Sequence, residues 1–386
     1  MKQNNMIQMI EQSQVEWKTI EEVFNIKNGY TPSKSNKEYW EKGTIPWFRM
    51  EDIRENGQII HDSLQKVSES AVKGGKLFPA NSIIVATSAT IGEHALITVP
   101  FLANQRFSCL SVKQKYQQNF DIKFLFYYCF LLSDWCKKNT TMSSFASVDM
   151  VGFRKFQIPI PPLETQKEIV RILDALTAVT SELTSELKLR QKQYQYYRDH
   201  LLSFGDEVEW KTLDKIAKNF DSMRKPIKSG LREKGKIPYY GASGIVDYVQ
   251  DYIFDGDFLL ISEDGANLLA RNTPIAFSVS GKSWVNNHAH VLQFSTYAER
   301  KFVEYYLNNI DLSPYISGAA QPKLNKQNLN NIKIPSPPLT TQQKIVEILD
   351  KFDRLTHSLS EGLPKEIELR RKQYEYYRDT LLNFPK

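Results

Sequence analysis

Residues 188–204 read KLRQKQYQYYRDHLLSF and residues 368–384 read ELRRKQYEYYRDTLLNF, and 12 of these 17 positions are identical. Further upstream, residues 156–176 (FQIPIPPLETQKEIVRILDAL) and residues 332–352 (IKIPSPPLTTQQKIVEILDKF) share 12 of 21 positions. The stretch that precedes each shared segment differs between the copies. A repeat separated by so much unlike sequence indicates two copies of one unit of roughly 190 residues, and not a solenoid of many short repeats.

Each shared segment has the pattern of a long amphipathic helix. Pro161-Pro162 and Pro337-Pro338 fit an extended lead-in that ends in the first helical turn, where proline loses no hydrogen bond. Apolar residues then recur at steps of three and four, which predicts two helices of about 40 residues, each with one apolar seam. Because such a seam must be covered, we expect the two helices to pack antiparallel as a coiled coil. The predicted seams consist of Ile169, Ile172, Leu176, Val179, Leu183, Leu187, Tyr194, Tyr197 and Leu201, and of Ile345, Ile348, Phe352, Leu355, Leu359, Leu363, Ile367, Tyr374, Tyr377 and Leu381.

The second copy carries four additional residues inside its helix. The offset between the copies is 176 at the Pro-Pro pairs and 180 at the tyrosines, so the insertion lies near Gly362-Leu363-Pro364-Lys365. Four extra residues interrupt a heptad pattern, and glycine and proline weaken a helix, so we predict a kink or break at this point.

The two variable stretches have the pattern of mixed α/β domains. Residues 82–87 and 258–262 are apolar runs typical of buried strands, and each is followed by a polar turn that contains glycine. Residues 15–19 recur as 208–212, and residues 124–128 resemble 302–306. We therefore predict a mixed α+β fold: two globular domains (1–158 and 205–331) joined by two antiparallel coiled-coil segments (159–204 and 332–386), with an internal pseudo-twofold repeat.

The composition is that of an ordinary globular protein. Of 386 residues, 41% are hydrophobic and 24% are charged, and the net charge of +6 is too small to indicate nucleic-acid binding through bulk charge. The densest basic stretch, residues 222–236, is interpreted as a solvated loop or as a local anion site. The three cysteines do not form a disulfide framework, which favours a reducing compartment. The longest apolar run (124–132) is too short for a membrane span and the first residues lack an apolar signal core, so we expect a cytoplasmic protein without membrane contact.

The motifs of the common catalytic classes are absent. Gly281-Lys282-Ser283 lacks the earlier glycine of a phosphate-binding loop, and no Gly-rich dinucleotide fingerprint follows a strand. His288 and His290 are favoured as hydrogen-bonding residues over metal ligands, because no third ligand is evident. Glu263-Asp264 fits a catalytic carboxylate pair or simply a turn beside a strand. We therefore expect no catalytic residue and no metal site on this chain.

The doubled segments IPxPPLxxQxxIVxILD and RxKQYxYYRDxLLxF resemble the specificity subunit of type I restriction–modification systems. The resemblance covers nearly the whole chain, and the alternation of two variable and two shared segments fits it. Residues 43–48 (GTIPWF), 89–92 (ATIG) and 318–323 (GAAQPK) also look like the target recognition domains of that family. In the first copy, the positions aligned with 318–323 read MSSFAS (142–147), so a shared contact role of that loop is in doubt.

The resemblance implies a subunit that reads double-stranded DNA and is not itself the catalyst. Each variable domain would read one half of a split, asymmetric site, and the coiled coil would set the spacer between the halves. Two modification subunits would dock around it, binding S-adenosylmethionine and methylating adenine. Restriction subunits that use ATP and Mg2+ would complete the nuclease, so no cofactor is expected on this chain.

Base reading and phosphate positioning require amide, hydroxyl and cationic side chains. The predicted DNA-binding residues of the first domain are Tyr30, Thr31, Ser33, Lys34, Arg49, Thr87, Ser88, Thr90, Gln105 and Arg106. Those of the second domain are Arg224, Lys225, Tyr240, Ser243, Asp264, Asn287, His288, Gln321 and Lys323. Tyrosine and arginine are enriched at protein interfaces. The tyrosine-rich helix ends therefore give the predicted partner-binding residues, Tyr194, Tyr197, Arg198, Tyr374, Tyr377 and Arg378.

Two alternatives stay open at this point. The chain could be a stand-alone nuclease with carboxylates around Glu263 and Asp264, or a coiled-coil scaffold of a methyltransferase with no role in DNA reading. Magnesium-dependent cutting by the isolated chain that is lost in Asp264→Ala would favour the nuclease. An assembled complex that prefers no duplex sequence would favour the scaffold.

Overall fold

A computed structural model describes residues 10, 15–142, 146–318 and 321–386. Contacts divide the chain into two compact units, Met1–Glu182 with Glu368–Lys386, and Leu183–Ile367. Each unit therefore combines one globular part with portions of both shared helical segments. The four segments predicted along the sequence stay a prediction. Among the described residues, no helix is long and apolar enough to cross a membrane.

The first unit is built on a five-stranded sheet that is buried on both faces. Its order is β2(Phe24–Asn28), β9(Phe107–Val112), β6(Ser82–Ala86), β7(His94–Ile97) and β4(Ile59–Ile60). All five residues of β6 are buried, which confirms the strand predicted there. Side chains of α4(Ile122–Lys138) pack with one face of the sheet and aromatic residues pack with the other. A small sheet, β5(Lys66–Val67), β3(Ile45–Phe48) and β8(Leu102–Ala103), completes the globular part.

The second unit repeats this order in one six-stranded sheet. The strands run β14(Lys218–Asn219), β19(Ala289–Gln293), β17(Phe254–Ser262), β18(Ala276–Val285), β15(Lys234–Gly241) and β16(Gly244–Val249). β18 pairs antiparallel with β17 and parallel with β15. In the first unit these two pairings are made by separate strands, since β7 pairs antiparallel with β6 and β8 pairs parallel with β3. Helix α9(Tyr297–Asn309) contributes to the core as α4 does in the first unit.

The shared sequence echoes become shared structure. β1(Glu16–Thr19) pairs with β12(Gln157–Ile160), and β13(Trp210–Thr212) pairs with β20(Lys333–Pro335). Trp17 lies opposite Pro159, as Trp210 lies opposite Pro335. The remaining helices and strands are short: α2(Ile20–Val23), α3(Met50–Asn56), β10(Thr140–Met142), β11(Ala146–Val148), α5(Met150–Lys155), α7(Leu213–Ile216), α8(Asn267–Ala270) and α10(Lys326–Asn330).

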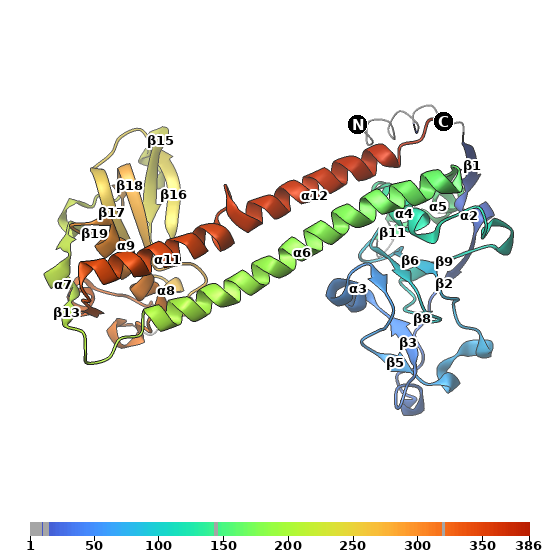
Figure 1. The fold of residues 1–386 in the computed structure, drawn as a ribbon, viewed down its shortest axis with the longest axis horizontal. Helices are drawn as coiled ribbons and strands as arrows, with labels where there is room; N and C mark the ends of the chain where they lie inside the picture. The colour runs from blue at the N-terminus through green and yellow to red at the C-terminus, as the bar shows by residue number, and fades with distance from the viewer. Residues whose placement is uncertain (1–9, 11–14, 143–145, 319–320) are drawn as a thin grey trace. The chain divides into compact units, whose positions relative to one another are not determined.

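The first shared segment forms one helix, α6(Leu163–Leu201), whereas the second forms two, α11(Leu339–His357) and α12(Gly362–Leu381) (Figure 1). In the first unit, the start of α6 packs with the end of α12. In the second, the end of α6 packs with α11, so within each unit the pairing is antiparallel.

The predicted seams are only partly confirmed. Ile169 and Ile345 are buried, but Val179 is exposed, and Leu359 is 82% exposed because it lies in the break between α11 and α12. Leu173 and Leu349, which the predicted stripes omit, are fully buried.

The predicted break lies just before Gly362, at residues 358–361, and not across Gly362–Lys365. Gly362 has a φ of +78°, a conformation that other residues adopt only at a cost. A Cβ atom there would overlap the carbonyl oxygens of Arg354 and Leu355 at the end of α11. Pro364 lies in the first turn of α12, where proline is tolerated and does not break the helix.

The same hydrogen bonds attach the globular part to its helix in both units. The Tyr127 hydroxyl donates to Asp174 on α6 at 2.7 Å, and the Tyr305 hydroxyl donates to Asp350 on α11 at 2.5 Å. The side-chain amide of Gln166 donates to the Pro161 carbonyl at 2.8 Å, and that of Gln342 donates to the Pro337 carbonyl at 2.9 Å. We call each tyrosine–aspartate pair, Tyr127–Asp174 and Tyr305–Asp350, a helix clasp.

Candidate nucleic-acid interface

Both units place polar residues at the same sheet edge. In the first, the Thr87 N–H donates to the Arg106 carbonyl at 3.0 Å, and in the second the Glu263 N–H donates to the His288 carbonyl at 2.9 Å. The next segment joins in the same way. Val148 N–H donates to the Thr87 carbonyl, and Leu324 N–H donates to the Glu263 carbonyl. We call these matching strand ends and the segment bonded to them the strand-edge frame. Each position of the frame in the first unit has an equivalent in the second. With the residue of the first unit named first, the equivalent pairs are Asn28 and Asp221, Thr87 and Glu263, Ser88 and Asp264, Asn104 and Asn286, Gln105 and Asn287, Arg106 and His288, Ser108 and His290, and Ser147 and Lys323.

Three predicted DNA-binding residues of each unit occupy equivalent positions of this frame. They are Ser88, Gln105 and Arg106 in the first unit, and Asp264, Asn287 and His288 in the second. The variable sequences hide this equivalence, because none of the three pairs is identical.

In the first unit, the frame opens onto a cavity of about 640 Å³. Six of the ten predicted residues line it: Thr31, Lys34, Arg49, Thr90, Gln105 and Arg106. Trp40 and the buried Trp47 also line it, and their rings meet edge to face at 5.0 Å between centroids. The lining also contains the carboxylates of Glu41 and Glu51, but its cationic, amide and hydroxyl groups suit contact with phosphates and bases.

Neutral hydrogen bonds hold the floor of this cavity. The Thr31 hydroxyl bonds the side-chain carbonyl of Gln105 and accepts from the Asn104 amide at 3.2 Å. Asn104 also accepts from the Arg106 N–H at 3.0 Å, which fixes the turn into β9. Asn104 is a structural residue that the sequence predictions did not include.

The other predicted residues of the first unit lie outside the cavity lining. The Tyr30 hydroxyl donates to the Ala71 carbonyl at 3.1 Å and accepts from the Lys73 N–H at 3.0 Å, so this side chain supports the fold. Ser33 bonds Ser35, and the Thr87 hydroxyl lies 3.3 Å from that of Ser108. Ser88 pairs through its backbone with Ser147.

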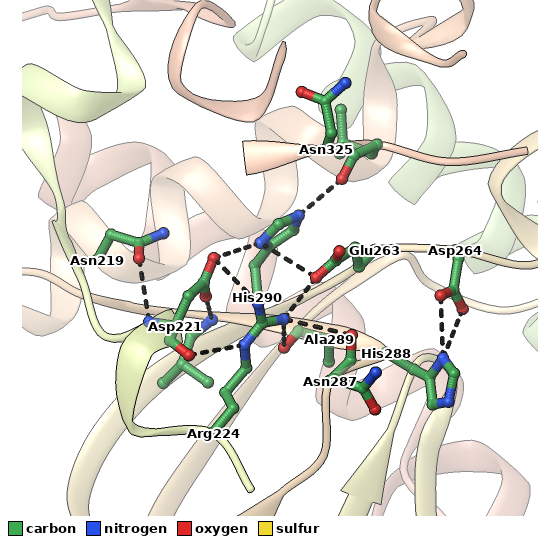
Figure 2. A network of polar contacts seen from close by, with 12 residues as sticks. Asn219, Asp221, Arg224, Glu263, Asp264, Asn287, His288, Ala289, His290 and Asn325 are labelled. Carbon is green, nitrogen blue, oxygen red and sulfur yellow. Dashed lines mark hydrogen bonds and ion pairs between the residues drawn. The ribbon is translucent and has the colours of Figure 1, made fainter. Parts of the chain in front are cut away.

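In the second unit, a buried charge network occupies the equivalent edge (Figure 2). Asp221 and His290 form an ion pair at 2.6 Å, and Arg224 reaches Glu263 at 2.5 Å. Figure 2 shows Arg224 and His290 between the two carboxylates. We call Asp221, Arg224, Glu263 and His290 the buried network.

The contacts of His290 and Arg224 leave them little capacity for a further ligand. His290 Nε2 lies 2.7 Å from the Leu324 carbonyl and Nδ1 faces Asp221, so both ring nitrogens face acceptors and must donate. Arg224 donates to the carbonyls of Asp221 and Ala289 as well as to Glu263. Arg224, a predicted DNA reader, is therefore an internal brace with most of its donors already used.

The cations keep both carboxylates of the network ionised. Burial acts to raise the pKa of Asp221, but its hydrogen bond and ion pair with His290 lower that pKa overall. Burial acts in the same direction on Glu263, where the hydrogen bond from Arg224 and the charge of His290 lower the pKa overall. Since Arg224 and Lys323 neutralise Glu263, this carboxylate is poorly suited to be the nuclease base considered above.

Above the network lies a polar rim. His288 Nδ1 lies 2.9 Å from both Asp264 carboxylate oxygens, and Lys323 Nζ lies 3.2 Å from Glu263 Oε1. Lys225, Ser243, Asn287 and Gln321 are exposed, whereas Tyr240 is half-buried against Phe277. The described part of the chain has no group of three or more histidine, cysteine or acidic residues placed to hold a metal ion.

The sequence missed Asp221, Glu263 and His290 as a unit. The sequence pattern indicated His290 as a hydrogen-bonding residue and Glu263 as a carboxylate beside a strand, but it did not connect them. Asp221 lies 69 residues from His290 in the chain, so no local pattern joins these two residues. Asp264 and His288 pair with each other, which their separate positions in the sequence could not reveal.

The predicted partner-binding residues all contact other residues of their own unit. Tyr194 is only 9% exposed and packs in the core of the second unit, so little of its side chain is accessible; its role as a partner contact stays a prediction. Tyr197 stacks on Phe352, and Tyr374 and Arg378 pack on Phe130. Arg198 lies over the Tyr194 ring, and Tyr377 packs against the first core.

The outward-facing aromatics are residues that the prediction passed over. Tyr196 is 66% exposed and Tyr376 is 61% exposed, and each meets the following tyrosine edge to face. A helical pattern alone could not separate these neighbours, because tyrosines occupy both faces.

The repeated frame agrees with the relatives of this sequence. The family model of the type I restriction modification DNA specificity domain matches residues 12–191 and again residues 205–369. The chain belongs to this family of type I restriction–modification specificity subunits. The EcoprrI specificity subunit of Escherichia coli is 51% identical over 365 residues, covering 90% of each chain. The EcoR124I/EcoR124II specificity subunit of Escherichia coli is 38% identical over 289 residues, covering 64% of this chain and 69% of that one.

Solved specificity subunits share the fold of this one. The S subunit from M. genitalium has a TM-score of 0.59 at 18% identity, and the alignment covers 97% of this chain and 98% of that one. The HsdS subunit from Thermoanaerobacter tengcongensis has a TM-score of 0.51 at 18% identity, covering 95% and 96%. The specificity subunit therefore has the predicted mixed fold with an internal repeat, and its role is DNA sequence specificity.

Proposed function

We propose that each unit reads one half of a bipartite, asymmetric site in double-stranded DNA. The observation that carries this proposal is the strand-edge frame, which occurs twice with the same backbone bonds and different side chains. A constant backbone with variable side chains is what two unlike half-sites require, since base edges are distinguished by donor and acceptor pattern. The shared helices would set the number of base pairs between the half-sites.

The two units would use different chemistry on this common frame. In the first, Gln105 and Thr31 offer amide and hydroxyl groups, and Arg106, Arg49 and Lys34 line the same cavity. Amides suit adenine edges, and cations suit guanine edges or phosphates. In the second, Lys323, His288 and Asn287 lie on the exposed rim.

The subunit would act within a larger assembly. Specificity subunits of this family are generally not catalytic, and one similar solved chain (TM-score 0.57, 17% identity) belongs to work on complex assembly of the type I restriction–modification system. We expect two modification subunits that bind S-adenosylmethionine and methylate adenine, and restriction subunits that use ATP and Mg2+. This chain would hold none of these cofactors, and the assembly would meet DNA in the cytoplasm.

Mapping methylated adenines in cells that carry this chain and its modification subunit tests the proposal. We expect methylation at one bipartite sequence with a fixed spacer, and no methylation in cells that carry either subunit alone. Methyl transfer by the purified chain alone would contradict the proposal, as would a complex without sequence preference. Magnesium-dependent cutting by the isolated chain would instead support the nuclease alternative, which the paired state of Glu263 disfavours.

A further inference from the structure

One cation on the rim of the second unit is fixed from two sides. Lys323 is exposed, with 51% of its side chain accessible, and its Nζ lies 3.2 Å from Glu263 Oε1. Its backbone N–H and carbonyl both bond Ser317, at 2.8 and 2.9 Å. Lysine side chains on a surface usually sample many rotamers, so this anchoring is a distinct feature of the site.

The buried network supplies the rigid support. Arg224 bonds Glu263 Oε2 at 2.5 Å, which leaves Oε1 for Lys323. His290 donates to the carbonyl of Leu324, the residue that follows Lys323, and its other nitrogen is held by Asp221. The side chain of Lys323 is therefore held by Glu263 and the carbonyl of the next residue by His290, and both holding residues belong to the buried network.

The first unit has neutral residues in all these places. Its frame shows Ser147 at the position of Lys323 and Thr87 at that of Glu263. The positions of His290 and Asp221 are taken by Ser108 and Asn28, which share a hydrogen bond of 3.1 Å. The anchored cation thus distinguishes the second unit from the first on an otherwise common frame.

We propose that Lys323 is a specificity-determining residue that selects guanine in the half-site read by the second unit. This inference rests on the proposed function. An ammonium group has three donors and no acceptor, so it matches the N7 and O6 acceptors of guanine and is opposed by the N6 donor of adenine. Arg224, Glu263 and His290 are positioning residues, because they hold Lys323 in place before DNA arrives and so reduce the entropy lost on binding.

The test uses the complex of this chain with its modification subunit and a duplex library whose half-sites are randomised. For the wild type we expect a guanine in one half-site. Lys323→Ser, which introduces the residue type found in the first unit, should relax discrimination at that guanine by roughly ten- to a hundredfold and leave the other half-site unchanged. Lys326→Ser is the matched control, because it removes an exposed cation three residues away. We expect this control either to leave DNA binding unchanged or to weaken binding to all DNA sequences equally.

The positioning role is tested by Glu263→Gln and His290→Asn in the same assay. Each should relax the same guanine position, provided that thermal melting shows a folded complex. The proposal is overturned if the half-site read by the second unit contains no guanine. It is also overturned if the Lys323→Ser complex keeps every guanine preference. Either result leaves the bipartite reading function standing. A wild-type complex without any site preference overturns the reading function and this proposal together.

Discussion

At the scale of single residues, one buried polar pair has a structural role although its side chains resemble a catalytic pair. In the first unit, the Ser133 hydroxyl lies 2.8 Å from His94 Nδ1, an arrangement that resembles a nucleophile and its base. Both residues are fully enclosed, and the His94 ring lies against Phe126 and Phe130. The pair therefore joins α4 to β7 and does no chemistry on a substrate.

This buried histidine predicts a specific dependence of stability on pH. Burial lowers the pKa of His94 from 6.5 to about 4, so the unfolded chain takes up a proton between these values and the folded chain does not. The free energy of unfolding should therefore fall as the pH is lowered, by about 2 kcal/mol from pH 7 to pH 5 at this one site. Urea denaturation of wild type and His94→Asn at both pH values measures it.

The variant His94→Asn should lack this contribution, so its stability should change less with pH than that of the wild type. His61→Asn, at an exposed histidine of the same unit, should keep the wild-type dependence. Equal pH dependence in wild type and His94→Asn would show that folding does not lower the pKa of His94.

The tyrosines show how far sequence reasoning reaches at this scale. The doubled YxYY pattern located the helix ends but did not identify their exposed aromatics, Tyr196 and Tyr376. It could not decide that Tyr194 points inward and Tyr196 outward, because that choice depends on packing against Phe352 and His357 from another part of the chain. In the same way, the pairing of Asp221 with His290 depends on the sheet register and not on any local motif.

At the scale of elements, the break between α11 and α12 depends on one glycine. Gly362 has a φ of +78° and no room for a Cβ atom against the last carbonyls of α11. Gly281 has a φ of +77° and no heavy atom within 4 Å of a Cβ position. Gly281→Ala should therefore cost about 1 kcal/mol through backbone strain, and Gly362→Ala should cost a further ~1–3 kcal/mol through overlap.

Urea denaturation of the full chain with the two alanine variants separates these contributions. Similar losses of stability would mean that α12 can shift away from α11 without cost. The sequence predicted the break from glycine and proline but placed it across Gly362–Lys365. The error arose because proline in a first turn is compatible with a helix, so Pro364 belongs to the start of α12 and not to the interruption.

Strands were predictable where the pattern was strong. The apolar runs at 82–87 and 258–262 are β6 and the end of β17. The sequence could not predict that Thr87 is equivalent to Glu263, or Ser108 to His290, since the paired side chains differ in chemistry. Only the register of neighbouring strands reveals that they occupy the same positions.

At the scale of the whole molecule, the proposed function makes the spacer between half-sites depend on the length of the shared helices. Deleting Gly362–Lys365 removes four residues, or about 6 Å of helix, and shifts the register of α12. We expect the modification complex of this variant to methylate sites with a different spacer or to assemble poorly. Mapping of methylated adenines and gel filtration of the complex distinguish these results.

Leu359→Ala is the control, because it lies in the break, is exposed and leaves the chain length unchanged. It should keep the wild-type spacer. An unchanged spacer with intact assembly after the deletion would show that this segment does not set the distance.

The helix clasps have a consequence for how such a molecule can acquire new specificities. Tyr127–Asp174 and Tyr305–Asp350 attach each globular part through residues that both copies share, and none of them belongs to the strand-edge frame. Attachment and recognition are therefore encoded by separate residues. The strand-edge frame can therefore change in sequence while Asp174 and Asp350 stay the same. A globular part from another such protein that carries the equivalent tyrosine could form the same hydrogen bond with the aspartate of either copy.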